Sequence, residues 1–158
     1  MKGVTGDSIT PEGLEALKAE LHELETARRQ EMSRRIEAAR SLGDLKENAE
    51  YHIAKDDQAH LETKILRLRE RLRSAVVVEP DADAGAFTFG TTAEVRDLSS
   101  DKVHTWTIVG PTEADIGQGK LSSESPVAEA LLGRAEGEEV AVETPGGTRR
   151  YRVERLAA

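Results

Sequence analysis

The sequence predicts an α+β fold in which an N-terminal antiparallel α-helical coiled-coil hairpin is followed by a small antiparallel β-sheet with one short helix. Two contrasting halves of the chain carry this prediction. Residues 1–76 repeat leucine at alternating spacings of three and four and contain no proline after Pro11, a pattern typical of helices that pack along one seam. Residues 77–158 place Val, Thr and Gly in short runs between turn residues, as in a sheet of short strands.

Charge and turn residues locate the division between the halves. Residues 1–76 carry 14 basic and 15 acidic side chains, against 8 and 15 in residues 77–158, so the net charge of −8 lies almost entirely in the second half. The stretch 79–85 combines proline, aspartate and glycine and is typical of a linker. We therefore expect a coiled-coil hairpin domain over residues 1–78 and a globular domain over residues 79–158.

The composition excludes several classes of protein. The chain has no cysteine, which removes disulfides, zinc fingers and thiol nucleophiles and fits a reducing cytoplasm. No apolar run approaches the roughly 20 residues of a membrane span, and the first residues lack the apolar segment of a secretory signal. The negative net charge argues against a protein that coats a nucleic-acid backbone. We expect a cytoplasmic protein with no membrane partner.

Two helices are predicted in the first half. Thr10 followed by Pro11 gives an N-cap and a first helical residue whose missing N–H costs nothing. The first seam runs through Leu14, Leu17, Leu21, Leu24, Arg28, Met32, Ile36 and Ala39. Its later steps of four predict a local stutter, and Gly43 supplies a C-terminal stop.

A second seam predicts a partner for the first helix. It runs through Ala54, Gln58, Leu61, Ile65, Leu68 and Leu72. Because only a few residues separate the two seams, the helices must fold back on each other as an antiparallel hairpin. We expect the hairpin to project from the globular domain, with the turn near residues 43–51 at its tip.

The second half predicts a sheet with one short helix. Residues 103–109 form a β-rich run, and alternating strands at 139–143 and 151–153 flank a Pro-Gly-Gly turn. Ser125-Pro126 repeats the cap-then-proline pattern and opens a helix that Gly133 ends. The aromatic side chains are core candidates: Phe87, Phe89, Trp106 and Tyr151.

Two acidic residues make the turn of the hairpin a candidate functional site. Asp44 and Glu47 lie three residues apart, and two carboxylates in one turn can converge on a hard divalent cation. The commoner explanation of Asp-x-x-Glu is a capping box, in which Asp44 caps the second helix and Glu47 bonds back to the cap. Both roles remain open. Leu45, an apolar residue in an exposed turn, is most simply explained by contact with a partner.

A local excess of arginine is the second candidate feature. Five arginines fall within thirteen residues of the first helix: Arg28, Arg29, Arg34, Arg35 and Arg40. The guanidinium fork suits phosphates, but interhelical ion pairs along a solvated flank explain the same residues. The four histidines lack metal-ligand spacing and no serine lies in a nucleophile elbow, so no self-contained active site is expected.

The turn sequence GDLKENAEY, residues 43–51, closely resembles that of the bacterial Gre transcript cleavage factors of the GreA type. The resemblance covers nearly the full chain. Its other blocks are residues 10–13, 52–55, 114–116, 125–128 and 144–147.

This resemblance implies a fold and a mechanism. The C-terminal domain would be FKBP-like and would dock on bacterial RNA polymerase at the rim of its secondary channel, through the part of the domain that contains Ser125 and Pro126. The coiled coil would enter the channel, where Asp44 and Glu47 help to hold the second Mg²⁺ while the polymerase hydrolyses its own displaced RNA 3′ end.

The same resemblance assigns the partners. Arg40 and Lys55 match tip-proximal basic residues near the RNA or the polymerase, and Leu45 would contact the polymerase as well. The factor would have no cofactor of its own, since Mg²⁺ is held jointly with the polymerase. It would not itself be an enzyme. The expected partners are RNA polymerase and the nascent RNA 3′ end, and the expected state is a monomer.

Two other functions remain as alternatives. Some relatives occupy the same channel but inhibit RNA polymerase without promoting cleavage; the presence of Asp44 and Glu47 argues against that. A prolyl isomerase acting through the FKBP-like fold would need an aromatic-lined pocket, whereas the aromatic residues are core candidates.

Overall fold

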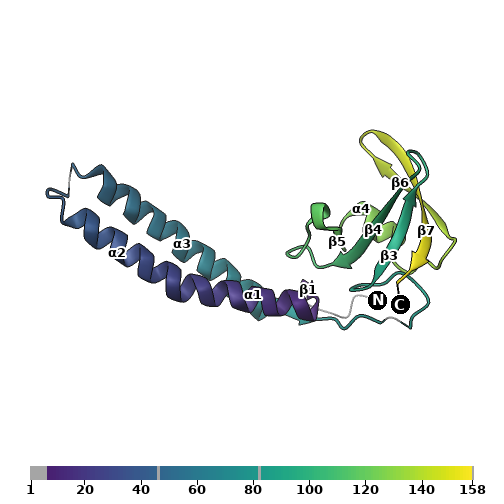
Figure 1. Cartoon of the computed structure of the whole chain (residues 1–158), viewed down its shortest axis with the longest axis horizontal. Coiled ribbons are helices and arrows are strands. Elements are labelled where there is room, and N and C mark those ends of the chain that lie inside the picture. Colours follow the sequence, from purple (N-terminus) through teal and green to yellow (C-terminus); the bar gives the residue numbers. More distant parts are fainter. Residues whose placement is uncertain (1–6, 46, 82, 158) are drawn as a thin grey trace. The chain divides into compact units, whose positions relative to one another are not determined.

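A computed structural model describes residues 7–45, 47–81 and 83–157 (Figure 1). The chain divides into two compact units. We call Leu14–Ser74 the hairpin unit, and Met1–Gly13 together with Ala75–Ala158 the sheet unit. The described residues 7–13 thus group with the C-terminal unit, whereas the sequence alone assigns them to the hairpin domain. The predicted α+β fold class is confirmed.

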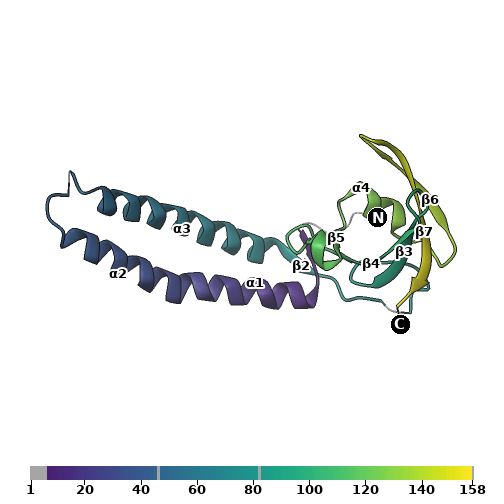
Figure 2. The same cartoon turned by 45° about the horizontal axis from the view of Figure 1, so that its top comes forward.

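The hairpin unit is built from helical segments. They are α1 (Pro11–Glu23), whose first three residues belong to the sheet unit, the π-helical turn η1 (Leu24–Arg28), α2 (Arg29–Arg40) and α3 (Ala49–Ser74). Figures 1 and 2 show α3 running back along the preceding helices. The buried side chains form the predicted seam: Leu17, Leu21, Leu24, Met32, Ile36, Ala39, Ala54, Leu61, Ile65 and Leu68. Of the other predicted seam positions, Arg28 is exposed, and Leu14, Gln58 and Leu72 are half-buried.

The π-helical turn η1 is the physical form of the predicted stutter. The buried Leu24 and Met32 are eight positions apart in the sequence. At about 100° per residue, eight residues overshoot two α-helical turns by about 80°, which would carry Met32 off the seam. A π-turn accommodates one extra residue, so Met32 returns to the seam. The Thr26 hydroxyl donates to the His22 carbonyl at 2.7 Å beside this turn.

The start of α1 is held within the sheet unit. The Gly13 N–H donates to Thr10 Oγ1 at 3.0 Å, which confirms the predicted cap. The Glu113 carboxylate in turn accepts from the Thr10 hydroxyl and from the N–H groups of Thr10 and Gly110, each N–H at 3.0 Å. Next to this cap, β1 (Asp7–Ile9) pairs in parallel with β2 (Ala75–Val77), a pair that the sequence did not predict.

The sheet unit contains a five-stranded sheet of order β5-β4-β3-β7-β6 (Figure 2). Its strands are β3 (Thr92–Asp97), β4 (Lys102–Val109), β5 (Lys120–Ser122), β6 (Glu139–Thr144) and β7 (Gly147–Leu156). The predicted β6–β7 hairpin is confirmed. The expectation of a purely antiparallel sheet is wrong, because β5 runs parallel to β4. The segment between them, which includes the 3-10 turn η2 (Ile116–Gln118), is long enough to carry the chain back to the level of Thr107.

The core of the sheet unit lies between this sheet and α4 (Pro126–Leu131). Ala128 and Leu131 of α4 are fully buried. Three of the four aromatic candidates are buried, and the fourth packs against them: Phe87, Trp106 and Tyr151, with Phe89. None of the helices in the described part of the chain combines the length and apolarity that crossing a bilayer requires.

Candidate site at the turn of the helical hairpin

The turn between α2 and α3 begins earlier than the sequence predicts. Helix α2 ends at Arg40, and the N–H groups of Ser41 and Leu42 bond back to the carbonyls of Glu37 and Ala39 at 3.2 and 3.1 Å. Gly43, the predicted stop, lies three residues beyond the helix, with φ of +120°. A side chain is strained at that φ, so glycine allows the chain to turn toward α3.

Asn48, not Asp44, caps α3. Its Oδ1 accepts the N–H of Tyr51 at 3.0 Å, and its carbonyl accepts the first helical hydrogen bond, from His52, at 3.2 Å. A cap must directly precede the first helical residue, here Ala49, and Asp44 lies too early in the chain to do so. The capping-box explanation of Asp44 and Glu47 is therefore wrong.

Asn48 makes a second bond with the other end of its amide. Nδ2 donates to the Ala39 carbonyl, near the end of α2, at 2.5 Å. One side chain thus joins the backbone at the end of α2 to the backbone at the start of α3.

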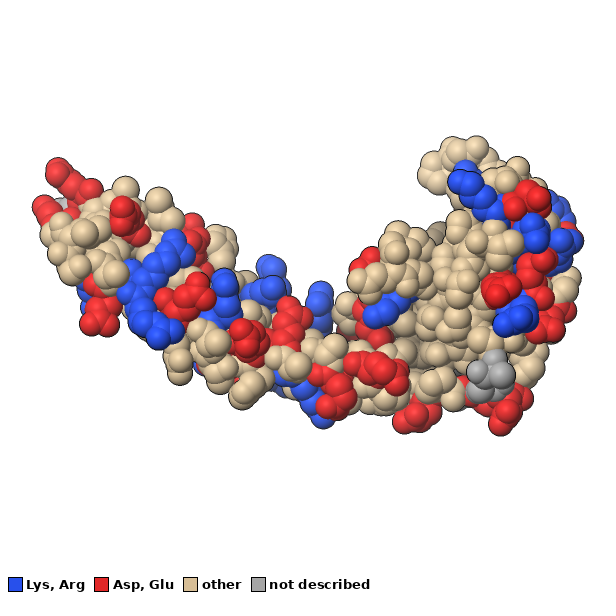
Figure 3. All heavy atoms as spheres, viewed as in Figure 1, with Lys and Arg blue, Asp and Glu red and all other residues tan. Residues whose placement is uncertain are grey.

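The predicted acidic residues lie together on this turn. Asp44, Leu45 and Glu47 are all exposed. An open hollow is lined by Leu42, Asp44, Glu47, Asn48, Ala49 and Glu50. Figure 3 shows acidic side chains at the turn end of the hairpin unit. Glu50 was not among the residues predicted from the sequence, although its position three residues after Glu47 was a signal for a third carboxylate on the same surface.

The turn offers carboxylate oxygens rather than a complete metal site. Among the described residues, no group of three or more His, Asp or Glu side chains could hold a metal ion. Asp44 and Glu47 could donate oxygen ligands to a divalent cation that takes its remaining ligands from a partner.

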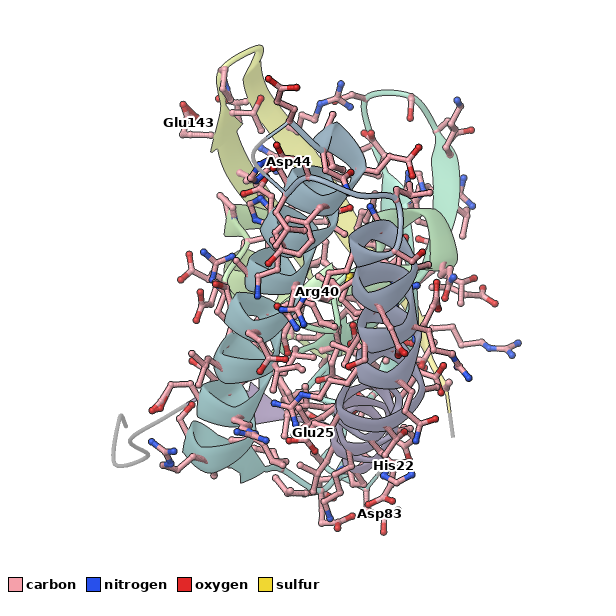
Figure 4. The ribbon with its side chains drawn as sticks, turned by 90° about the vertical axis from the view of Figure 1, so that its left-hand side faces the viewer. His22, Glu25, Arg40, Asp44, Asp83 and Glu143 are labelled. Atoms are coloured by element: carbon pink, nitrogen blue, oxygen red, sulfur yellow. The ribbon has the colours of Figure 1, made fainter. Side chains whose placement is uncertain are left out.

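Arg40 and Lys55, the predicted contacts to an anionic partner, lie close to the turn. The Arg40 guanidinium lies over the Tyr51 ring, 5.8 Å from its centroid, and Figure 4 shows Arg40 between the two helices. Lys55 Nζ donates to Gln58 Oε1 at 3.0 Å. Within the described residues neither cation is paired with a carboxylate, so both charges are available to phosphates.

Most of the other arginines of α2 and η1 form ion pairs within the hairpin. Arg28 pairs with Glu31 at 3.7 Å, Arg29 with Glu62 at 2.7 Å, and Arg35 with Asp57 at 2.7 Å. The hydrogen bond from Arg29 lowers the pKa of the Glu62 carboxyl, against the opposing effect of its desolvation. For these three arginines, the ion-pair explanation is the one that the structure supports.

An apolar surface also lies beside the turn. Leu42 and Ile53 are 65% and 56% exposed, and they line a groove together with Arg35, Ala38, Ala39 and Glu50. This surface was not predicted from the sequence. Its signal was two large apolar residues, Leu42 and Ile53, that lie off the predicted seams.

Ser125 and Pro126, the predicted docking residues, start α4. Ser125 Oγ accepts the N–H of Ala128 at 3.3 Å and donates to the Ser122 carbonyl at 2.7 Å, so its hydroxyl is used within the unit. This confirms Ser125 as a helix cap. Pro126 is exposed and presents its ring at the surface.

Comparison with known proteins covers both units. The family model described as "Transcription elongation factor, N-terminal" matches residues 8–77, and that described as "Transcription elongation factor, GreA/GreB, C-term" matches residues 82–157. The transcription elongation factor GreA of Listeria welshimeri is 43% identical over 151 residues, 95% of this chain and 94% of that protein. The GreA of Clostridioides difficile is 45% identical over 146 residues, 92% of each chain. Among solved structures, GreA factor homolog 1 (Gfh1) of Thermus thermophilus is 27% identical, covers 96% of this chain and 98% of that one, and has a TM-score of 0.42.

Proposed function

This chain belongs to the GreA/GreB family of transcription elongation factors, and we propose that it acts by stimulating RNA cleavage in stalled RNA polymerase. It binds RNA polymerase, inserts the hairpin unit into the secondary channel and promotes Mg²⁺-dependent hydrolysis of the RNA 3′ end in backtracked complexes, so that elongation resumes. The observation that carries this proposal is the pair of exposed carboxylates, Asp44 and Glu47, on a turn whose helix cap is supplied by Asn48.

The chemistry divides between the two proteins. Two-metal phosphodiester hydrolysis uses one ion to activate water and one to stabilise the leaving oxygen. Asp44 and Glu47 would donate oxygen ligands to the ion that the polymerase holds less firmly, and the polymerase would supply the remaining ligands. The factor therefore has no cofactor of its own and is not an enzyme. The isolated protein should not hydrolyse RNA at any Mg²⁺ concentration.

The neighbouring side chains bind the RNA and the channel. Arg40 and Lys55 interact with phosphates of the displaced RNA 3′ end, for which a guanidinium and an ammonium beside the acidic turn are suited. Leu45, 40% exposed, contacts the polymerase. In the sheet unit, the start of α4 docks on the polymerase through the exposed Pro126, while Ser125 holds the shape of that turn through its cap.

Substitutions at Asp44 and Glu47 test this function. Asp44→Asn and Glu47→Gln each remove one negative charge without altering the cap at Asn48. In stalled elongation complexes with Mg²⁺, we expect each variant to shorten the RNA at least about tenfold more slowly, which corresponds to about 1.4 kcal/mol of transition-state stabilisation. Polymerase binding and helix content should equal those of the wild type.

Two results would contradict the proposal. One is unchanged RNA shortening by both variants. The other is a wild-type protein that slows RNA synthesis without shortening transcripts, which is the behaviour of a channel-blocking inhibitor.

A further inference from the structure

We propose that Asn48 is a positioning residue for the acidic turn: its amide joins the end of α2 to the start of α3 and thereby fixes how Asp44 and Glu47 are presented. This inference rests on the proposed cleavage function and extends it to a residue that neither carries charge nor ligates metal. We call the two hydrogen bonds of the Asn48 side chain, from the Tyr51 N–H and to the Ala39 carbonyl, the Asn48 clasp.

Both ends of the amide are used, each for a backbone group at a helix end. The Tyr51 N–H is one of the first donors of α3 and has no partner within the helix. The Ala39 carbonyl, one of the last acceptors of α2, already accepts the Leu42 N–H at 3.1 Å and accepts the Asn48 amide with its second lone pair. An amide has an acceptor oxygen and a donor nitrogen at fixed positions, so it can serve one group of each kind at once. The distances of 3.0 and 2.5 Å show both bonds formed.

Capping alone does not require asparagine. Aspartate and serine cap a helix about as well. An aspartate carboxylate, however, has no donor for the Ala39 carbonyl, and a serine hydroxyl is too short to serve both partners. The second bond is therefore the part of the clasp that is specific to asparagine.

The packing beneath the turn brings the two helix ends within reach of one short side chain. The seam residues nearest the turn are Ala39 and Ala54, with exposed fractions of 4% and 0%. Small side chains allow the backbones of two helices to approach closely. Asn48 is half-buried there, while its neighbours Glu47 and Ala49 are exposed.

The clasp closes the turn at its base. Asp44 and Glu47 lie between the bonded residues Ala39 and Asn48, so the bond limits the conformations that the intervening chain can adopt. The clasp also positions Arg40. Arg40 directly follows Ala39, and its guanidinium lies over the ring of Tyr51, whose N–H donates to Asn48. One side chain thus holds both the acidic residues and this arginine in place.

Asn48→Ser separates positioning from helix capping, because serine keeps the cap and loses the bond to Ala39. We expect the rate of RNA shortening in stalled complexes to fall about tenfold at low Mg²⁺ and to recover at high Mg²⁺. The Mg²⁺ concentration that gives half-maximal cleavage should rise accordingly. Helix content, thermal unfolding and polymerase binding should match the wild type. Thr63→Ala is the matched control, since it removes one side-chain bond to a backbone carbonyl elsewhere on α3 and should leave cleavage unchanged.

The outcomes distinguish this inference from the proposed function. Wild-type cleavage by Asn48→Ser, with cleavage lost in Asp44→Asn, overturns the clasp and leaves the function standing. Wild-type cleavage by both variants overturns both. Loss of helix content or of polymerase binding in Asn48→Ser also overturns the positioning role, because the residue would then serve the fold.

Discussion

The hairpin unit and the sheet unit are stabilised in different ways. In the hairpin unit a single row of apolar side chains lies between two helices, and its ion pairs lie on exposed flanks. In the sheet unit, Phe87, Ile108 and Leu131 are fully buried in one core, and the side chain of Asp97 is buried as well. The difference indicates where this protein can carry function: the turn of the hairpin unit has only the end of a narrow seam beneath it, so exposed acids there cost little stability.

The largest expected effect comes from creating a cavity in the closed core. Leu131→Ala should destabilise the sheet unit by about 2–5 kcal/mol, because Leu131 is fully buried and the lost side chain leaves a void. Trp106, the single tryptophan, lies in this core and reports its unfolding by fluorescence.

Leu61→Ala is the matched substitution in the hairpin. Leu61 is 7% exposed in the seam, where solvent and neighbouring side chains can fill the space that the substitution leaves. We therefore expect Leu61→Ala to lower the free energy of unfolding by less, as measured by thermal unfolding followed by circular dichroism. If Leu61→Ala lowered the free energy of unfolding as much as Leu131→Ala does, the two units would not differ in how they are stabilised.

The buried carboxylate of the sheet unit should make its stability depend on pH. Burial raises the pKa of Asp97, but hydrogen bonds from the Ser99 and Ser100 N–H groups, together with the Arg149 charge, outweigh it, so the pKa lies below its usual value. A depressed folded pKa stabilises the unit above the unfolded pKa of about 3.9, and this contribution is lost as pH falls toward the folded value.

Asp97→Asn tests this assignment. At neutral pH the variant should be less stable by about 1 kcal/mol, roughly the difference between hydrogen bonds to charged and neutral acceptors. The difference in stability between the variant and the wild type should narrow as the pH is lowered below about 4, because the Asp97 carboxyl of the unfolded chain then takes up a proton while that of the folded chain is still ionised. If the difference in unfolding free energy between Asp97→Asn and the wild type stayed constant through that pH range, Asp97 would not be the group that makes the stability depend on pH.

The same contrast explains what could be predicted from the sequence. Periodicity revealed the seam and the strands of the β6–β7 hairpin, and a capping residue followed by proline revealed the caps at Thr10 and Ser125. The turn motif indicated the family that the family models confirm. The three-residue strands β1 and β5 are too short to show a period, so their pairing and direction were not predictable.

The cap at the turn was ambiguous for a different reason. Asp44-x-x-Glu47 matches a capping box as well as it matches a metal-directed pair. Which residue caps α3 depends on where α2 ends and on how closely the helices approach, and neither is encoded in the spacing. The Asn48 bond to Ala39 is a tertiary contact, and so are the stack of Arg40 on Tyr51 and the hollow that Glu50 shares with Glu47.

The smallest expected effect is at an exposed ion pair of the hairpin. Arg35 and Asp57 form a bond of 2.7 Å, but their side chains are 45% and 43% exposed, so solvent screens the attraction. Arg35→Ala should lower the stability of the hairpin by less than about 0.5 kcal/mol, measured by thermal circular dichroism, and added salt should reduce the difference further. Arg34→Ala is the control, since Arg34 has no carboxylate partner among the described residues. If Arg35→Ala cost more than about 1 kcal/mol relative to that control, the flanks would stabilise the hairpin as strongly as buried side chains do. The hairpin would then depend on its charges, and substitutions near the turn could no longer be assumed to leave its fold intact.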